Sequence, residues 1–183
     1  MRVIPVLLVA ALLTACAADP AKIEAVAVDE AARLRPPTQL LSTFKTYELQ
    51  AMTYGEAIQI EEKKMAEARE FETVFIDKIG SLLDIWNAAD SATGEGKLLI
   101  QPHLAALKVV SGGARFWAGA FAGDSFIDVD LRLIDGDSGV VVADVRVRRD
   151  ADAMTGAWSV GKSDQNLDDY IVSIVHQYLT DNY

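Results

Sequence analysis

The chain has 183 residues, of which 17 are basic and 27 acidic, so its formal net charge is −10. This length suits one domain with its own hydrophobic core. The acidic balance argues against nucleic-acid binding and against an electrostatic hold on anionic lipid, because both need a basic surface.

Residues 1–15 have the pattern of a secretory signal peptide. Arg2 is followed by an apolar run from Val3 to Leu13 and then by small residues. The run is too short to span a bilayer core, which needs about 20 apolar residues. A cation, a short apolar stretch and a small-residue cleavage site together predict export of the chain.

The run closes with Leu13-Thr14-Ala15-Cys16, which contains the only cysteine of the chain. These four residues resemble a lipobox, the processing sequence of bacterial lipoproteins. The resemblance implies that Cys16 becomes an acylated N-terminal residue that anchors the chain in a membrane. Ala17 follows instead of Asp, and by the same resemblance this favours the outer membrane, with the domain facing the periplasm. Ala15-Cys16-Ala17 also fits an ordinary cleavage site, which would release a soluble secreted protein.

Residues 16–38 are predicted to be the lipidated cysteine and a flexible tether. This segment is rich in alanine, carries scattered charges and ends in Arg35-Pro36-Pro37, which favours an extended backbone. A short strand or helical turn around residues 23–28 is the alternative. Residues 39–183 then form a single periplasmic domain. With no second cysteine to make a disulfide, this domain must be held together by its core.

The first half of the domain predicts one strand and one long helix. Gln39–Leu49 is rich in aromatic and β-branched residues and alternates from Ser42 onward, which is typical of a strand. Ile58–Ala88 begins with strong helix formers and continues with apolar residues at i, i+3, i+4 spacing, which predicts a helix with one buried face. That face comprises Phe71, Val74, Phe75, Ile79, Leu82, Leu83 and Trp86.

A second strand is predicted over Lys97–Val110. Pro102 lacks an N–H for the strand ladder, so it marks a sheet edge or a bulge. The neighbouring His103 has no nearby cysteine or acidic partner in the sequence, and we expect a surface or edge histidine.

A turn of glycines and aromatic residues follows and is the candidate partner-binding site. Exposed aromatic side chains beside glycines would suit a protein partner or a membrane. Alternatively, the glycines form a tight turn whose aromatic side chains fold back into the core. The candidate residues are Arg115, Phe116, Trp117 and Phe121, and residues 116–122 are also a candidate for a short extra strand.

Phe126–Ile134 and Val140–Arg148 predict a β-hairpin. Apolar and charged residues alternate in both segments, and Asp137-Ser138-Gly139 suits a three-residue loop with Gly139 in the left-handed conformation. This register places three pairs of opposite charge on the exposed face, which stabilise the alignment. The pairs are Asp128 with Arg148, Asp130 with Arg146, and Arg132 with Asp144.

The chain closes with a predicted helix over Asp164–Thr180. Ser163 or Asp164 is the candidate N-cap, and acidic residues in the first turn suit the positive end of the helix dipole. One face is continuously apolar, which predicts that it packs on the core.

The sequence offers no catalytic residue, metal site or cofactor site. Only two histidines occur, neither lies in a known catalytic motif, and the single cysteine belongs to the anchor. Asp135-Gly136-Asp137 faintly resembles part of a calcium loop, but it lacks the further oxygen ligands that such a loop needs. Turn formation accounts for these residues better.

From Lys97 onward, the order of features resembles a family of uncharacterised bacterial envelope lipoproteins with a Gly-rich turn between strands. That order is a strand, Gly112-Gly113, Arg115, a glycine-spaced aromatic turn, an alternating strand, Asp135 with Ser138-Gly139, another strand and a helix. The resemblance spans about residues 39–183. It implies a small α+β periplasmic domain and brings no established activity or catalytic residues.

We expect a two-layer α+β fold, in which two helices pack on one face of a mostly antiparallel sheet of four to five strands. The leading hypothesis is a non-enzymatic, lipid-anchored envelope protein that binds a protein partner through the aromatic turn or an open sheet edge. The alternatives are a lipid-anchored hydrolase of envelope glycans and a periplasmic small-ligand carrier. The expected partners are the membrane, through Cys16, and an envelope protein, with no nucleic acid and no cofactor.

Overall fold

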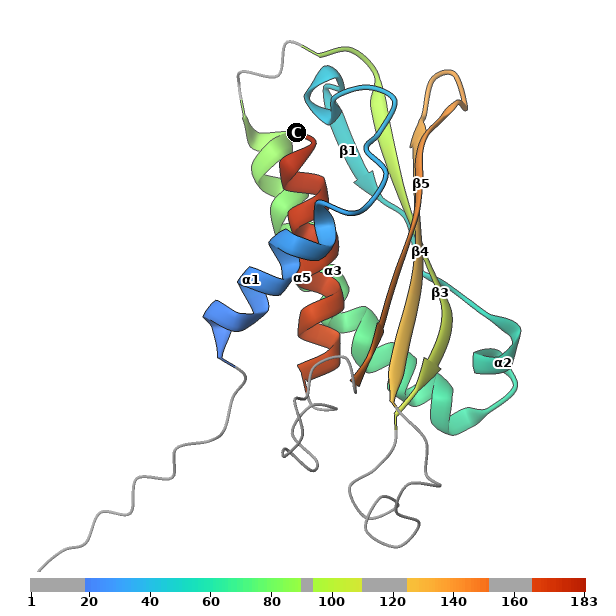
Figure 1. Cartoon of the computed structure of the whole chain (residues 1–183). Helices are drawn as coiled ribbons and strands as arrows, with labels where there is room; N and C mark the ends of the chain where they lie inside the picture. Colours follow the sequence, from blue (N-terminus) through green and yellow to red (C-terminus); the bar gives the residue numbers. More distant parts are fainter. Residues whose placement is uncertain (1–18, 90–93, 110–124, 152–165) are drawn as a thin grey trace, which may run out of the picture.

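The computed structural model describes residues 19–89, 94–109, 125–151 and 166–183. It has the α+β architecture expected from the sequence, with an open five-stranded sheet and its two longest helices packed on one face (Figure 1). The helices are α1 (Pro20–Ala31), α2 (Glu56–Gln59), α3 (Glu62–Ala88) and α5 (Leu167–Asp181), with a short 3-10 turn, η1, at Leu41–Thr43. The strands are β1 (Thr46–Leu49), β2 (Thr53–Tyr54), β3 (Lys97–Lys108), β4 (Phe126–Asp135) and β5 (Val141–Asp150).

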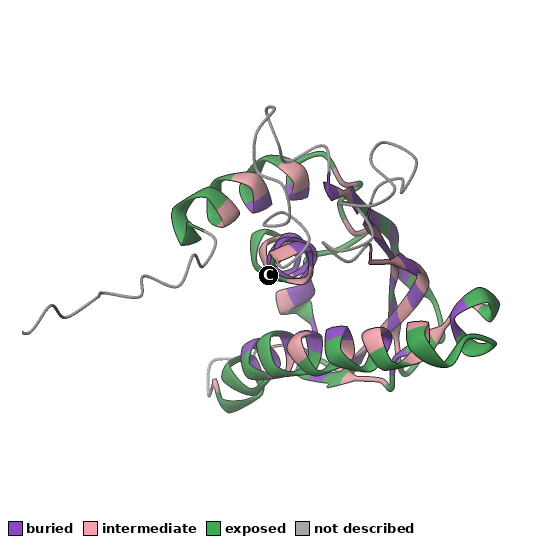
Figure 2. Cartoon of the chain, turned by 90° about the horizontal axis from the view of Figure 1, so that it is seen from below, coloured by how far each residue is buried: buried purple, intermediate pink, exposed green. Residues whose placement is uncertain are grey.

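The sheet is mixed, with its longest strands antiparallel. The strand order is β1-β3-β4-β5, and β2 also pairs with β3. β4 is antiparallel to both β3 and β5, whereas β1 and β2 run parallel to β3. α3 and α5 contact the sheet, and α1 packs on α5. Viewed from below, α5 lies between α1 and α3 (Figure 2).

The core fills the layer between the sheet and the helices. The predicted apolar face of the long helix is confirmed, because Phe71, Phe75 and Ile79 are fully buried on α3. The final helix is also confirmed, and Ile171 and Val175 are among its buried residues. It begins at Leu167 after Asn166, and the predicted N-caps lie outside the described residues.

The predicted tether is wrong for residues 20–31, which form α1. Asp19 caps this helix by accepting a hydrogen bond from the Ala21 N–H through Oδ1 (3.1 Å), and Pro20 at the first helical position has the φ angle that a helix needs. Ala27 and Ala31 are buried, and these small side chains let α1 approach α5 closely. The helix ends before the proline pair, as the backbone preference of those prolines requires.

The first strand is shorter than predicted. Leu41 and Phe44 bury their side chains around η1, and the Tyr47 hydroxyl donates to the backbone oxygens of both residues. These contacts turn the chain before Thr46, so that only Thr46–Leu49 pairs with β3. The predicted strand Gln39–Leu49 is therefore correct only in its last four residues.

The predicted hairpin is confirmed together with its register. Asp130 lies opposite Arg146, and Leu131 lies opposite Val145. Gly139 has a φ of +73°, the left-handed conformation that the loop was expected to need. Within the described part of the chain, no helix is long and apolar enough to cross a membrane.

Candidate functional site

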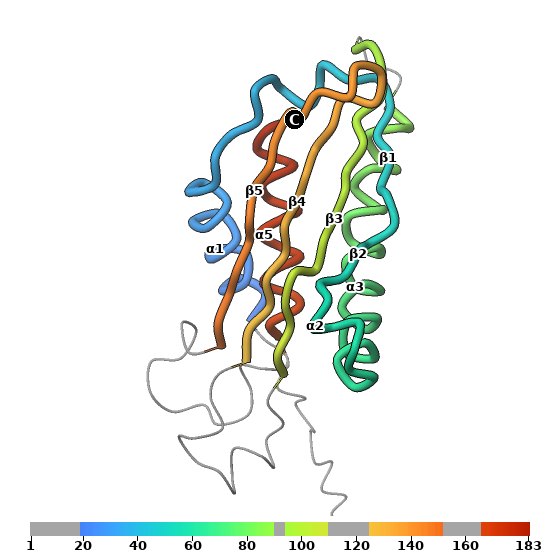
Figure 3. Tube along the Cα trace, turned by 90° about the vertical axis from the view of Figure 1, so that its right-hand side faces the viewer, coloured from blue at the N-terminus to red at the C-terminus, as the bar shows by residue number. Residues whose placement is uncertain are grey.

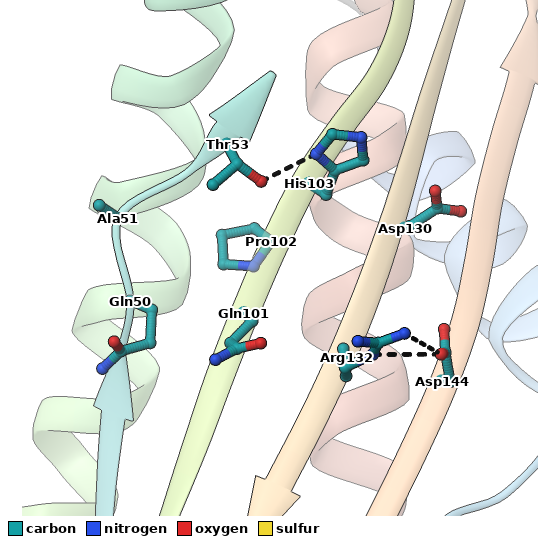
Figure 4. A pocket seen from close by; sticks show the side chains of 9 residues that line it. All are labelled: Gln50, Ala51, Thr53, Gln101, Pro102, His103, Asp130, Arg132 and Asp144. Carbon is teal, nitrogen blue, oxygen red and sulfur yellow. Dashed lines mark hydrogen bonds and ion pairs between the residues drawn. The ribbon is translucent and has the colours of Figure 1, made fainter. Parts of the chain in front are cut away.

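The face of the sheet opposite the helices carries an open polar groove. Its lining residues come from β2, β3, β4 and β5 and from the segment that links β1 to β2. The polar side chains among them stand on the side of the strands away from α3 and α5 (Figure 4). The groove has a volume of about 660 Å³. Its lining residues are Gln50, Ala51, Thr53, Gln101, Pro102, His103, Asp130, Arg132 and Asp144.

Pro102 explains why the groove opens at this point. The backbone oxygens of Ile100 and Leu104 accept hydrogen bonds from Gln50 N–H and Gly55 N–H, both at 2.9 Å. Alternate residues of a strand turn their backbone groups to the same side, so Pro102 also faces the β1–β2 segment. It has no N–H to offer there, and the pairing is interrupted between β1 and β2.

The sequence predicts that Pro102 marks a sheet edge or a bulge. In the structure, Pro102 instead lies beside the break between β1 and β2. β3 itself is a central strand, flanked by β1 and β2 on one side and β4 on the other. Its own irregularity comes between Leu104 and Ala106.

His103 is half-buried in the groove and has a partner that the sequence does not reveal. Its Nδ1 shares a hydrogen bond with the Thr53 hydroxyl at 2.8 Å. The two residues meet because β2 pairs in parallel with β3, which places Thr53 beside His103. On the other side, His103 lies opposite Asp130 on β4. Among the described residues, the His103 imidazole donates no hydrogen bond to the Asp130 carboxylate, so Asp130 does not orient it as a triad carboxylate would.

The far wall of the groove is a charged pair. Arg132 donates from Nε and Nη2 to Asp144 Oδ2, at 3.2 Å and 3.0 Å. Both side chains are about half exposed, so the pair contributes little to stability and leaves donor and acceptor groups at the surface. This is the cross-strand pair expected from the sequence.

Next to the groove, on the same face, the predicted pairs of Asp128 with Arg148 and of Asp130 with Arg146 are present, but both arginines make closer contacts elsewhere. Arg146 donates from Nε to Asp128 Oδ1 at 2.7 Å, and its Nη2 contacts Asp128 Oδ2, whereas its nearest approach to the predicted partner Asp130 is 3.8 Å. Arg148 donates to Asp150 at 3.0 Å and lies 3.6 Å from Asp128. Arg146 therefore bonds a diagonal partner on β4, whereas Arg148 bonds a residue of its own strand.

Asp128 is fully buried, although the sequence predicts an exposed position. A carboxylate out of contact with water needs compensating charge and hydrogen bonds. The two arginines supply these, and the hydrogen bond with Asp128 raises the pKa of Arg146 further. This fixed charge cluster extends the polar groove toward the end of β5.

The candidate partner-binding residues Arg115, Phe116, Trp117 and Phe121 lie outside the described residues, as does the candidate lipidation residue Cys16. Both therefore stay predictions. The Asp135 turn is described, and its carboxylate accepts hydrogen bonds from the N–H groups of Asp137 and Ser138 at 2.9 Å and 3.2 Å. This is the turn-forming role expected for these residues. No group of three or more His, Cys, Asp or Glu side chains in the described ranges is placed to hold a metal ion.

A second, smaller hollow lies between α1, α3 and α5 and has a volume of about 380 Å³. Lys78 crosses it to donate to the Ser173 hydroxyl at 2.8 Å. His176 lines it, and burial together with the Lys78 charge lowers the pKa of this histidine. The hollow is on the helix side of the molecule, whereas the layer between the helices and the sheet is filled by core side chains.

No protein-family model matches the chain, and no curated protein sequence matches it. Among solved structures, it is similar to the PelC dodecamer from Paraburkholderia phytofirmans, with 10% identity, a TM-score of 0.45, and coverage of 79% of this chain and 96% of that one. A single-residue variant of the same dodecamer gives 12% identity, a TM-score of 0.45, and coverage of 81% and 92%. Similarity at this level says nothing about function.

Proposed function

We propose that this chain is a lipid-anchored protein of the bacterial cell envelope that binds a protein partner and is not an enzyme. Acylation at Cys16 supplies the anchor, the outer membrane is its site, and the domain faces the periplasm. The support for the anchor is the sequence pattern of residues 1–16 and the position of the only cysteine.

The main support for the binding role is the polar face of the sheet, which carries an open groove among the described residues. The long helices α3 and α5 pack on the sheet from the other side, which leaves side chains of β3, β4 and β5 around an open groove (Figures 2 and 4). Small-molecule sites are usually concave and largely apolar. A wide polar surface with paired arginines is more typical of a contact with another protein.

The arrangement of charges favours binding over catalysis. Asp128 and Asp144 are each neutralised by arginine, so neither carboxylate is free to act as a base. Thr53 and His103 form a hydrogen-bonded pair but lack an orienting third group among the described residues. The aromatic turn of residues 115–121 remains our second candidate for the partner-binding surface.

A site-specific cross-linking experiment tests the binding role. A photoreactive amino acid at Gln101, in the groove, should give one adduct of defined mass in cells. The same amino acid at Ile85, an exposed position on α3, is the control and should not give this adduct. Replacing Arg132 and Asp144 together by alanine should remove the Gln101 adduct without unfolding the protein. Identical adducts from both positions would contradict a binding surface on the sheet.

The anchor is tested by intact mass and membrane fractionation of the protein with and without Cys16→Ser. The natural protein should carry an acyl-sized mass increment and sediment with membranes, and the variant should lose both. Two soluble forms cleaved at the same ordinary site would contradict the lipoprotein assignment.

A further inference from the structure

We infer that the folded domain sits directly on the lipid surface that holds Cys16, with the end where α1 and α5 begin turned toward the membrane. This inference rests on the proposed acylation of Cys16. The surface that this end of the domain contacts is phospholipid. The support for the contact is the short length of chain between Cys16 and the first helix.

The connection between the anchor and the fold is very short. α1 begins at Pro20, and its cap is Asp19, only three residues after Cys16. A fully extended chain advances by at most about 3.6 Å per residue, so Cys16 and Asp19 are separated by no more than about 11 Å. The chain between Cys16 and α1 is therefore too short to hold the domain away from the membrane.

α1 is held to the rest of the domain, so the short connection constrains the whole fold. Ala27 and Ala31 are buried where α1 packs on α5. Glu30, near the end of α1, lies 3.6 Å from Arg149 of β5, whose guanidinium stacks over the Tyr170 ring of α5. Beyond the helix, the backbone oxygen of Arg35 accepts a hydrogen bond from the Tyr178 hydroxyl at 2.9 Å.

The position of Pro20 shows which end of the domain meets the lipid. Pro20 and Asp169, in the first turn of α5, line the same hollow between the helices. The start of α1, the start of α5 and the end of β5 lie at one end of the molecule, and the β4–β5 turn lies at the other (Figure 3). α5 spans 15 residues, so Asp181 is about 20 Å further along the helix from this end.

The charges at this end indicate that the acyl chains, and not ionic contacts, hold the domain on the surface. Asp168 lies near Asp169 and near Glu67 and Glu70 of α3, and its burial together with these charges raises its pKa. Such an acidic group is repelled by anionic headgroups. The lipid surface that fits this end is therefore zwitterionic, and the polar groove on the sheet face is left accessible from the side.

Two matched cysteine variants test this orientation. The acylated full-length protein is prepared as Asp169→Cys or Asp181→Cys, so that the same substitution stands at exposed positions near the two ends of one helix. Each new thiol is labelled with a fluorophore, because Cys16 is blocked by acylation. The proteins are bound to phosphatidylcholine vesicles that carry a short-range quencher on their headgroups. We expect strong quenching at position 169 and several-fold weaker quenching at position 181.

A linker insertion provides the control. A flexible Gly/Ser segment of about 20 residues between Cys16 and Asp19 should reduce quenching at position 169 to the level at position 181. Equal quenching at both positions in the protein without the insertion would overturn the orientation and leave the anchor intact. If the protein without the insertion fails to float with vesicles, the proposed anchor is overturned and this inference falls with it.

Discussion

The side-chain amide of Asn87 closes the outer edge of β1 by imitating a neighbouring strand. Asn87 Oδ1 accepts a hydrogen bond from Tyr47 N–H at 2.8 Å, and its Nδ2 donates to the Tyr47 backbone oxygen at 2.9 Å. Unpaired edge groups invite pairing with other chains. The expectation that an open edge adds a strand from a partner is therefore wrong at this position of β1.

Replacing Asn87 by alanine should destabilise the protein by about 1–2 kcal/mol, because two hydrogen bonds to a buried residue are lost. Urea unfolding measures this change as a lower midpoint with an unchanged slope. Ile85→Ala is the control, since Ile85 is 68% exposed on the same helix, and it should change the free energy of unfolding by no more than about 0.5 kcal/mol. Equal losses in both variants would show that the amide has no special role.

Two glycines should respond to alanine in opposite directions. Gly55 lies between β2 and α2, and a Cβ at this position would come within 2.1 Å of the backbone oxygen of Ala105 in β3. Gly55→Ala should therefore cost about 1–3 kcal/mol through forced backbone movement. A Cβ at Gly80, inside α3, meets nothing within 4 Å, so Gly80→Ala should stabilise the protein by about 0.5–1 kcal/mol. Thermal unfolding of the two variants shows whether each is more or less stable than the natural protein. A lower stability of Gly80→Ala would contradict the expectation for that position.

The elements that the sequence predicts well are those with a strong local pattern. The β4–β5 hairpin follows from period-two alternation, a short loop and opposite charges, all within 25 residues. The long helix follows from helical spacing of large apolar residues such as Phe71 and Phe75. In both cases the information lies in neighbouring residues and needs no knowledge of the rest of the fold.

The misassigned elements depend on contacts between distant segments. α1 is stable because Ala27 and Ala31 pack on α5, nearly 150 residues later, and alanines give little hydrophobic pattern. Thr53 meets His103 only because β2 pairs with a strand 50 residues away. The signal that could have pointed to the groove was Pro102, whose missing N–H marks where a neighbouring strand must break. The burial of Asp128 has no counterpart in the sequence pattern.

The buried carboxylate of Asp128 makes Arg146 more important than the other arginine pairs. Arg146→Ala removes two hydrogen bonds to a fully buried charge and leaves Arg148 as its one ion-pair partner among the described residues. We expect a loss of about 2–4 kcal/mol, since an uncompensated buried charge is costly. Arg132→Ala breaks a pair that is half exposed and should cost less than about 1 kcal/mol.

The double variant Asp128→Asn with Arg146→Ala distinguishes two causes of the lost stability, the unpaired buried charge of Asp128 and the lost packing of the Arg146 side chain. Removing the carboxylate charge should recover most of the stability that Arg146→Ala loses, as measured by chemical unfolding of the four proteins of the cycle. A double variant as unstable as the sum of the two single variants would contradict a role for the buried charge.

Asp168 should make the protein less stable at neutral pH than at mildly acidic pH. Burial, Asp169 and two glutamates of α3 raise the pKa of Asp168 from 3.8 to about 6. The folded state thus binds the proton more tightly than the unfolded state, so the stabilising contribution is complete below about pH 4 and is lost as the pH rises through about 6. Asp168→Asn removes the charge and should stabilise the protein at pH 7 but not at pH 4.

The gain at pH 7 should be about 1 kcal/mol. A pKa difference of about two units sets an upper limit of about 3 kcal/mol, and the half-buried side chain keeps part of its hydration, which reduces this value. The carboxylate also favours the positive end of the α5 dipole, which reduces it further. Asp169→Asn, the same substitution at an exposed position of the same turn, should change stability by less than about 0.5 kcal/mol. Since both substitutions remove one charge from the first turn of α5, a pH-dependent gain confined to Asp168→Asn must come from the surroundings of Asp168, which are its burial and its acidic neighbours. An equal gain in both variants would assign it to the helix end instead.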